Sequence, residues 1–221
     1  MTAVTVLRHK FVRGWPRQAA GEGCMVLDLG EALSREYSED AHFAAYYSPN
    51  GRRLTREAID ELGRVELTCI VFDVDGPDHA ADERWRRETR DKVQALAAEH
   101  PGLFYYETRG GARIVYRQEE PTVLRSQADA NEWSRAYAIA IAHLERRFGI
   151  AADPACNDWQ RLYRLPHATR DEGKSPENWP IWGNPRSIGT LLLDAEPADV
   201  RRAQATSRAS FNSSHEAVRA E

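Results

Sequence analysis

Two carboxylates stand at the end of an apolar run in the middle of the chain. Asp73 and Asp75 are two residues apart, directly before a glycine and a proline. Since side chains alternate along a strand, both carboxylates point to one face, while Phe72 and Val74 fill the other. Such a pair of oxygen donors suits Mg²⁺ or Mn²⁺. A strand that runs into a solvated acidic turn would have the same sequence, so both interpretations stay open at this point.

A glycine turn lies about 35 residues downstream. Arg109 and Arg113 flank Gly110 and Gly111. Backbone N–H groups bracketed by two fixed cations are what a polyphosphate requires of a loop. A plain hairpin, with solvated arginines and glycines that supply positive φ, is the alternative.

A third segment combines a carboxylate with two arginines. Asp153 precedes Arg161 and Arg164, which are three residues apart, and Pro166 follows. Taken alone, Asp153 before a proline is a turn signal and the arginines are ordinary surface residues. Combined with the first two segments, this one is better evidence for a functional site.

The elements that must position these residues can be predicted from periodicity. We expect strands at 42–48, 67–75, 103–107 and 112–117, and helices at 55–62, 80–100 and 128–148. The order strand, helix, hairpin, helix predicts an α+β sheet with helices on one side. Residues 158–166 and 179–194 are not assigned, apart from an apolar run at 190–193.

Composition limits the class of protein. The 221 residues are 42% apolar, which supports a large core, and three separated cysteines indicate neither a disulfide framework nor a zinc site. No apolar stretch approaches the roughly 20 residues that span a bilayer, so we expect a cytoplasmic protein without membrane contact. A net charge of −4 argues against binding nucleic acid by bulk charge alone. Twenty-seven of the 30 basic residues are arginine, which codon usage in a GC-rich genome explains, so only particular positions count as evidence.

Together the three segments resemble the archaeo-eukaryotic primase superfamily, in its bifunctional primase/polymerase (prim-pol) branch. That family has an Asp-x-Asp strand, a glycine turn that leads to a cationic strand residue, and an Asp followed by Arg-x-x-Arg-h-Pro, where h is apolar. The resemblance covers roughly residues 40–170. It implies an α+β (α/β) fold with a two-lobed primase-type core, an RRM-like lobe, and helices packed on mixed or antiparallel sheets. The implied division is an N-terminal elaboration at 1–40, a catalytic core at 41–203 and a flexible polar tail or linker at 204–221.

The resemblance also implies a reaction and its residues. It implies template-directed nucleotidyl transfer from (d)NTPs on DNA, in replication of a phage, plasmid or mobile element or in repair, with a fused or separate helicase as a possible partner. Two Mg²⁺ or Mn²⁺ ions and no zinc are implied, held by Asp73, Asp75 and Asp153 as the catalytic residues. The implied nucleotide-binding residues are Arg109, Gly110, Gly111, Arg113, Arg161, Arg164 and His167.

Two departures from the family pattern keep other functions open. The family usually has histidine where this chain has Arg113, and glycine then asparagine where this chain continues with His167-Ala168. Because arginine does not release its proton, a primase-like domain that only binds nucleotide or DNA is one alternative. A haloacid-dehalogenase-type phosphohydrolase, with Asp73 as nucleophile, is a second, although Pro77 and the missing later acidic motif count against it.

Overall fold

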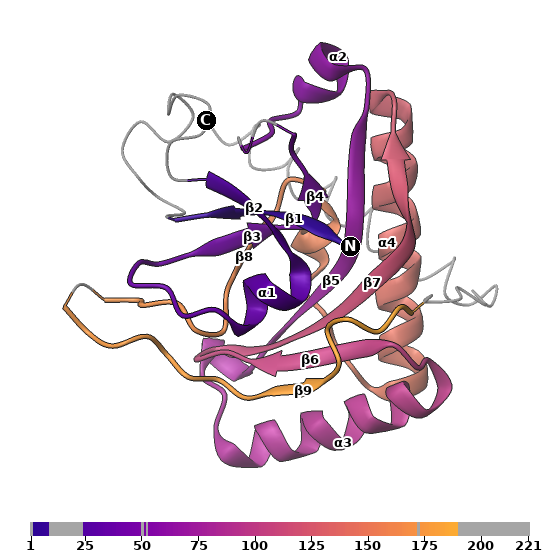
Figure 1. Ribbon diagram of the computed structural model, residues 1–221. Coiled ribbons are helices and arrows are strands. Elements are labelled where there is room, and N and C mark those ends of the chain that lie inside the picture. The colour runs from indigo at the N-terminus through magenta and orange to yellow at the C-terminus, as the bar shows by residue number, and fades with distance from the viewer. Residues whose placement is uncertain (1, 9–23, 50, 52, 172, 190–221) are drawn as a thin grey trace, which may run out of the picture.

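The computed structural model describes residues 2–8, 24–49, 51, 53–171 and 173–189 (Figure 1). They form two antiparallel sheets and, in this part of the chain, four α-helices. The predicted α+β class is confirmed. The predicted apolar run at 190–193 and polar tail at 204–221 lie outside the described residues.

The first sheet has the strand order β2-β1-β3-β8. Its strands are β1 (Ala3–Leu7), β2 (Cys24–Asp28), β3 (His42–Ala44) and β8 (Leu162–Arg164). Helix α1 (Leu29–Ser34) follows β2 and begins where Asp28 accepts a hydrogen bond from the Gly30 amide. The described part of residues 1–40 therefore contributes two strands to the sheet that carries Arg164, and the predicted domain boundary at residue 40 stays a prediction.

The second sheet has the order β4-β5-β7-β6-β9. Its strands are β4 (Tyr46–Tyr47), β5 (Val65–Asp75), β7 (Gly111–Leu124), β6 (Leu103–Glu107) and β9 (Ile181–Gly183). The predicted single strand at 42–48 is wrong: it is split between the two sheets, because β3 pairs with β1 and β8 whereas β4 pairs with β5.

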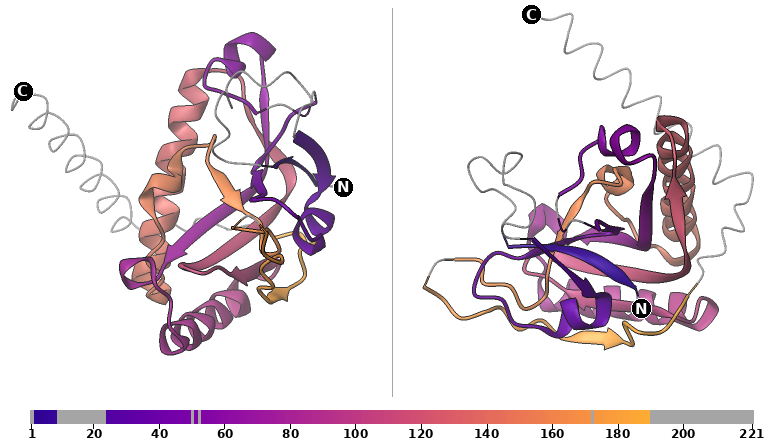
Figure 2. Two further views of the ribbon diagram at one scale, coloured as in Figure 1. Left: turned by 90° about the vertical axis from the view of Figure 1, so that its left-hand side faces the viewer. Right: turned by 45° about the horizontal axis from the view of Figure 1, so that its top comes forward.

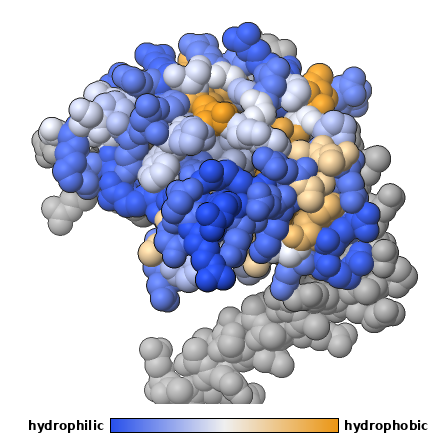
Figure 3. All heavy atoms as spheres, turned by 90° about the horizontal axis from the view of Figure 1, so that it is seen from below, coloured by the Kyte–Doolittle hydropathy of each residue, from blue (hydrophilic) through white to orange (hydrophobic). Residues whose placement is uncertain are grey.

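The helices lie where the periodicity predicts them. These are α2 (Ala58–Leu62), which begins three residues later than expected, α3 (Glu83–Glu99) and α4 (Gln127–Phe148). Two short 3₁₀ turns, η2 (Pro77–His79) and η3 (Pro154–Asn157), complete the described elements. None of the described helices is long and apolar enough to cross a membrane. The face that carries α3 is mostly hydrophilic (Figure 3).

Alternation along β5 separates the core from the site. Phe72 points toward α4 and stacks on Tyr137, with ring centroids 5.1 Å apart, and the Tyr137 hydroxyl donates to the Val71 carbonyl over 2.6 Å. Asp73 points to the opposite face, toward the first sheet. Figure 2 (left) shows the long strands between α4 on one side and the first sheet on the other. Thus β5 brings its carboxylates to the space between the two sheets.

Candidate functional site

Asp73 on β5 lies beside Arg113 on β7, because these two strands pair in antiparallel register. The register pairs Asp73 with Arg113 and Arg113 with Tyr106 across three strands. Arg113 donates to Asp73 Oδ2 over 3.2 Å and to the Arg164 carbonyl over 3.1 Å, and the Tyr106 hydroxyl donates to the same carbonyl. Arg113 therefore ties the second sheet to β8 of the first.

Arg113 is a permanently charged and nearly buried group. Its side chain is 11% exposed. Burial opposes the charged form, but Asp73 and Tyr106 outweigh it and raise the pKa of Arg113 above its ordinary value. Its Nε is buried and makes no hydrogen bond among the described residues, so one donor is left unsatisfied. At this position the chain has a fixed cation and no proton donor that titrates near neutral pH.

Asp153 adjoins Asp73 through the main chain. The Asp153 amide donates to the Asp73 carbonyl over 2.7 Å. Its side chain begins η3 by accepting from the Ala155 amide, and Arg161 donates to its Oδ2 over 3.0 Å. The structure thus brings the third predicted carboxylate next to the first, paired with one of the predicted arginines.

The two glycines of the turn allow close approach to the end of β5. A side chain at Gly111 would meet the Val74 carbonyl oxygen at 2.1 Å, and one at Gly110 would meet the His79 carbonyl oxygen at 2.9 Å. The Gly110 carbonyl accepts from the Gly76 amide over 2.8 Å. The protein's own backbone therefore requires both glycines, and their contact with phosphate stays a prediction.

A cavity of about 220 Å³ opens where the hairpin turn meets the loops that follow β5 and β8. It joins five predicted residues: Asp75, Arg109, Gly110, Arg113 and Arg164. The other residues that line it were not among the predicted site residues: His79, Thr108, Leu165, Arg170, Glu177 and Trp179. We call this cavity the arginine pocket. Four guanidinium groups around so small a volume make an anion site.

Three arginines of the pocket already hold a carboxylate. Arg113 pairs with Asp73, as described above. Arg109 donates to Glu177 Oε1 over 2.5 Å. Arg164 makes a bidentate pair with Asp40, over 2.5 and 2.9 Å. An anionic ligand must therefore exchange with internal carboxylates at these three positions.

Five other predicted residues do not line the arginine pocket, and one of them, Gly111, packs against the end of β5 as described above. Asp73 and Asp153 adjoin it through Arg113 and the main-chain contact above, and Arg161 is held at Asp153. His167 contributes its carbonyl to the Tyr37 amide. Roles of Arg161 and His167 in nucleotide binding stay predictions.

The carboxylates suit a divalent cation in their chemistry. Asp75 is the most open, with a side chain 39% exposed and its Oδ1 3.4 Å from His79 Nδ1. Among the described residues, however, no three His, Cys, Asp or Glu side chains are grouped closely enough to hold a metal ion. Asp73 is paired with Arg113, and Asp153 is paired with Arg161. The binding of Mg²⁺ or Mn²⁺ by these carboxylates stays a prediction.

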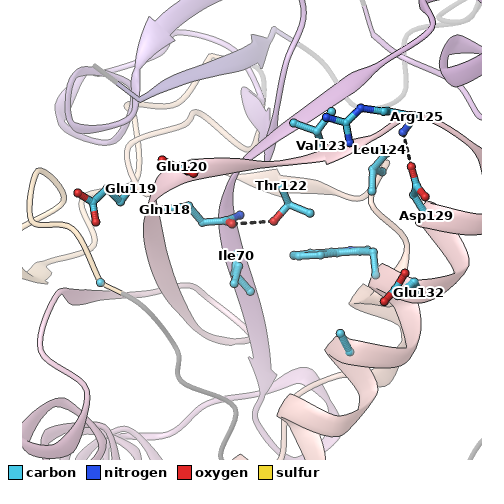
Figure 4. Close-up of a pocket in the computed structure, with 13 residues that line it drawn as sticks. Ile70, Gln118, Glu119, Glu120, Thr122, Val123, Leu124, Arg125, Asp129 and Glu132 are labelled. Atoms are coloured by element: carbon cyan, nitrogen blue, oxygen red, sulfur yellow. Dashed lines mark hydrogen bonds between the residues drawn. The ribbon is translucent and has the colours of Figure 1, made fainter.

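A larger cavity of about 700 Å³ lies elsewhere, between the bulged part of β7 and α4 (Figure 4). It contains none of the predicted site residues, and four carboxylates line it: Glu119, Glu120, Asp129 and Glu132. One of them, Asp129, accepts from the Arg125 amide over 2.6 Å. This negative lining repels anions, so of these two cavities the arginine pocket is the one that suits an anion.

Comparisons with known proteins give little beyond this geometry. No protein-family profile and no curated protein matches the sequence. Among solved structures, the crystal structure of primase RepB′ is similar, with a TM-score of 0.37 and 13% sequence identity. The match covers 98% of this chain, which spans 61% of that one. The functional proposal below therefore stands on the motifs and the arginine pocket.

His42 should make the protein less stable in acid. It is 2% exposed, and its Nδ1 lies 2.7 Å from the Asp40 carbonyl, so Nδ1 carries the proton of the neutral ring. Burial lowers the pKa of His42 from 6.5 to about 3. The negative charge of Asp40 opposes this shift, whereas the positive charges of Arg164 and Arg113 add to it. The unfolded chain thus binds more protons between these values, and stability rises with pH across that window.

We expect this single group to add a slope of up to about 1.4 kcal/mol per pH unit between pH 6.5 and 3. Urea unfolding of the wild type and of His42→Asn, measured at several pH values, checks it. The asparagine amide takes the place of Nδ1 and can donate to the Asp40 carbonyl but does not titrate, so its slope should be shallower. Equal slopes in the two proteins would contradict the assignment.

Proposed function

We propose that this protein is a primase/polymerase that performs metal-dependent, template-directed nucleotidyl transfer from (d)NTPs. The observation that carries the proposal is the arginine pocket, in which the hairpin and the Arg164 segment meet beside Asp75, with Asp73 and Asp153 adjoining. Cationic groups next to oxygen donors are the arrangement that a nucleoside triphosphate and its metal ions require.

The size of the pocket favours the phosphate portion of the substrate. At about 220 Å³ it is smaller than the roughly 300–1,000 Å³ of sites that enclose a whole drug-sized ligand. The triphosphate would lie between Arg109, Arg113 and Arg164, and the base would remain outside, where it can pair with a template. Selection of the base by pairing rather than by a protein pocket is what template-directed synthesis needs.

The chain's own residues then orient the reacting groups. Asp73, Asp75 and Asp153 would hold the divalent ions, whose chemistry at such a site is activation of a 3′-hydroxyl and neutralisation of the leaving pyrophosphate. By binding phosphate, Arg113 would release Asp73. Arg161 would do the same for Asp153. The DNA template and primer, and a fused or separate helicase, are partners under the same proposal.

A template assay tests this function. A single-stranded template, with and without an annealed primer, is incubated with labelled NTPs or dNTPs in Mg²⁺ or Mn²⁺. We expect labelled products longer than the primer in at least one combination. The complete absence of product would overturn the proposal.

A binding domain without turnover is the second candidate. It is favoured by the pairing of Asp73 with Arg113 and of Asp153 with Arg161, which leaves the carboxylates engaged. Calorimetric titration with Mn²⁺ and a deoxynucleoside triphosphate, beside the assay above, separates binding from turnover. Phosphohydrolase chemistry has less support, because Asp73 is 8% exposed and paired, and so is not poised to attack phosphorus. Hydrolysis of p-nitrophenyl phosphate without polymerisation would favour it.

A further inference from the structure

Arg170 differs from the other arginines of the arginine pocket. Arg109, Arg113 and Arg164 are each paired with a carboxylate. Within the described part of the chain, Arg170 makes no hydrogen bond and no ion pair within 4 Å. Yet it lines the same pocket and is half-buried. It is the guanidinium that can bind an anion without first giving up a carboxylate.

The main chain directly before Arg170 is fixed by hydrogen bonds. The buried Thr169 donates through its amide to the Tyr37 carbonyl over 3.0 Å and through its hydroxyl to the same oxygen over 2.7 Å. The Ala168 carbonyl accepts from the Glu177 amide over 3.1 Å. Because these contacts hold the backbone, the position of Arg170 at the pocket does not depend on a side-chain partner.

The charges around Arg170 also favour an anion. Burial, followed by the repulsion of Arg164 and Arg109, lowers the pKa of Arg170 below its ordinary value, against the weaker attraction of Glu177 and Asp40. Arginine keeps its proton at neutral pH all the same. The repulsion is therefore relieved by a ligand of opposite charge and not by loss of the proton.

We propose that Arg170 is the principal anion-binding residue of the arginine pocket and that the pocket takes a linear polyphosphate. This rests on the proposed function, in which the polyphosphate is the triphosphate of a (d)NTP. Phosphate binding at Arg109 or Arg164 replaces one charge-assisted hydrogen bond by another, so the net gain there is small. At Arg170 the whole interaction is gained.

Glu177 competes with an anionic ligand for the arginine pocket. Its Oε1 holds Arg109 and its Oε2 accepts from the Trp179 indole over 3.0 Å. Since Glu177 lines the pocket, its negative charge competes directly with phosphate for Arg109. Neutralising it should strengthen anion binding.

Calorimetric titration with sodium tripolyphosphate, in chelator and at constant low ionic strength, tests the proposal without metal or nucleoside. We expect Arg170→Ala to weaken the affinity by about 10- to 100-fold, the range of a lost charge-assisted contact. Arg109→Ala should weaken it less, and Arg170→Lys should fall between wild type and Arg170→Ala because it keeps the charge without the planar fork. Glu177→Gln should strengthen binding.

Arg84→Ala is the matched control. Arg84 lies on α3, is 80% exposed and pairs with Glu88, so its removal should leave tripolyphosphate affinity unchanged. The thermal midpoint of each variant shows whether it is folded. If Arg170→Ala does not fold, the affinity of Glu177→Gln still tests the proposal.

The results distinguish this inference from the proposed function. No tripolyphosphate binding by wild type, equal affinities of wild type and Arg170→Ala, a larger effect at Arg109, or weaker binding by Glu177→Gln would each overturn the inference, even if the protein extends primers. Binding that depends on Arg170 in a protein that makes no product would instead support it and overturn the polymerase proposal.

Discussion

The Asp75→Asn variant should lose primer extension by about 10³-fold or more while it keeps its affinity for DNA. Charge stabilisation by a bound metal is worth several kcal/mol in a transition state, and about 4 kcal/mol corresponds to 10³-fold in rate. Asparagine keeps the shape of the side chain but removes the negative charge. Since Asp75 is 39% exposed and its contact is an exposed one with His79, the fold should not suffer. Extension rates and DNA binding by fluorescence anisotropy measure the two effects.

Asp78→Asn is the matched control for this experiment. Asp78 lies three residues further on, is exposed, and has a φ of 53°, which asparagine adopts readily. It should extend primers at the wild-type rate. An active Asp75→Asn protein would remove Asp75 from the proposed metal ligands.

The Arg86→Ala variant should lose about 3–5 kcal/mol in the free energy of unfolding, the usual cost of breaking a buried ion pair. Arg86 and Glu107 are 8% and 6% exposed and lie 3.0 Å apart. Arg86 also donates to the Thr108 and Arg109 carbonyls, and its guanidinium carbon lies 4.6 Å from the centre of the Trp179 ring. Its loss would leave buried acceptors unsatisfied beneath the hairpin turn.

Urea denaturation followed by circular dichroism measures this loss. Arg84→Ala, on the exposed side of the same helix, should change stability by less than about 1 kcal/mol. A similarly small change for Arg86→Ala would show that Arg90, which lies 2.9 Å from the other oxygen of Glu107, is a sufficient partner for that carboxylate.

Local patterns predicted the long elements well because those elements depend on local contacts. Helices α3 and α4 follow from their apolar periodicity and from caps at Asp82 and Ser126. Strand β7 is longer than expected, because its pairing with β5 breaks at a bulge opposite Leu67–Cys69, which contains Pro121, and resumes at Thr122. Strands β8 and β9 have three residues each, too few for a period, and are defined by partners far away in the sequence.

Within the site, too, local patterns predict some contacts, whereas contacts between residues distant in sequence have no local signal. Asp73 and Arg113 lie on a strand and a hairpin that local patterns predicted, and the pairing of β5 with β7 brings the two side chains together. The bidentate contact of Arg164 with Asp40 spans 124 positions, and no local pattern signals it. Arg170 and Glu177 lie in a segment of irregular structure, where spacing carries no information about which side chains meet.

The pairing of β3 with β8 determines when the arginine pocket can form. His42 pairs with Arg164, and Tyr37 bridges to Ala168, so strands from opposite ends of the described chain must meet before the pocket exists. Contacts so distant in sequence carry a large loop-closure cost and slow folding. On the ribosome, the second sheet from β4 to β7 and helix α4 can form first. Under the proposed function, the pocket that would hold a polyphosphate is complete only after Trp179 has left the exit tunnel.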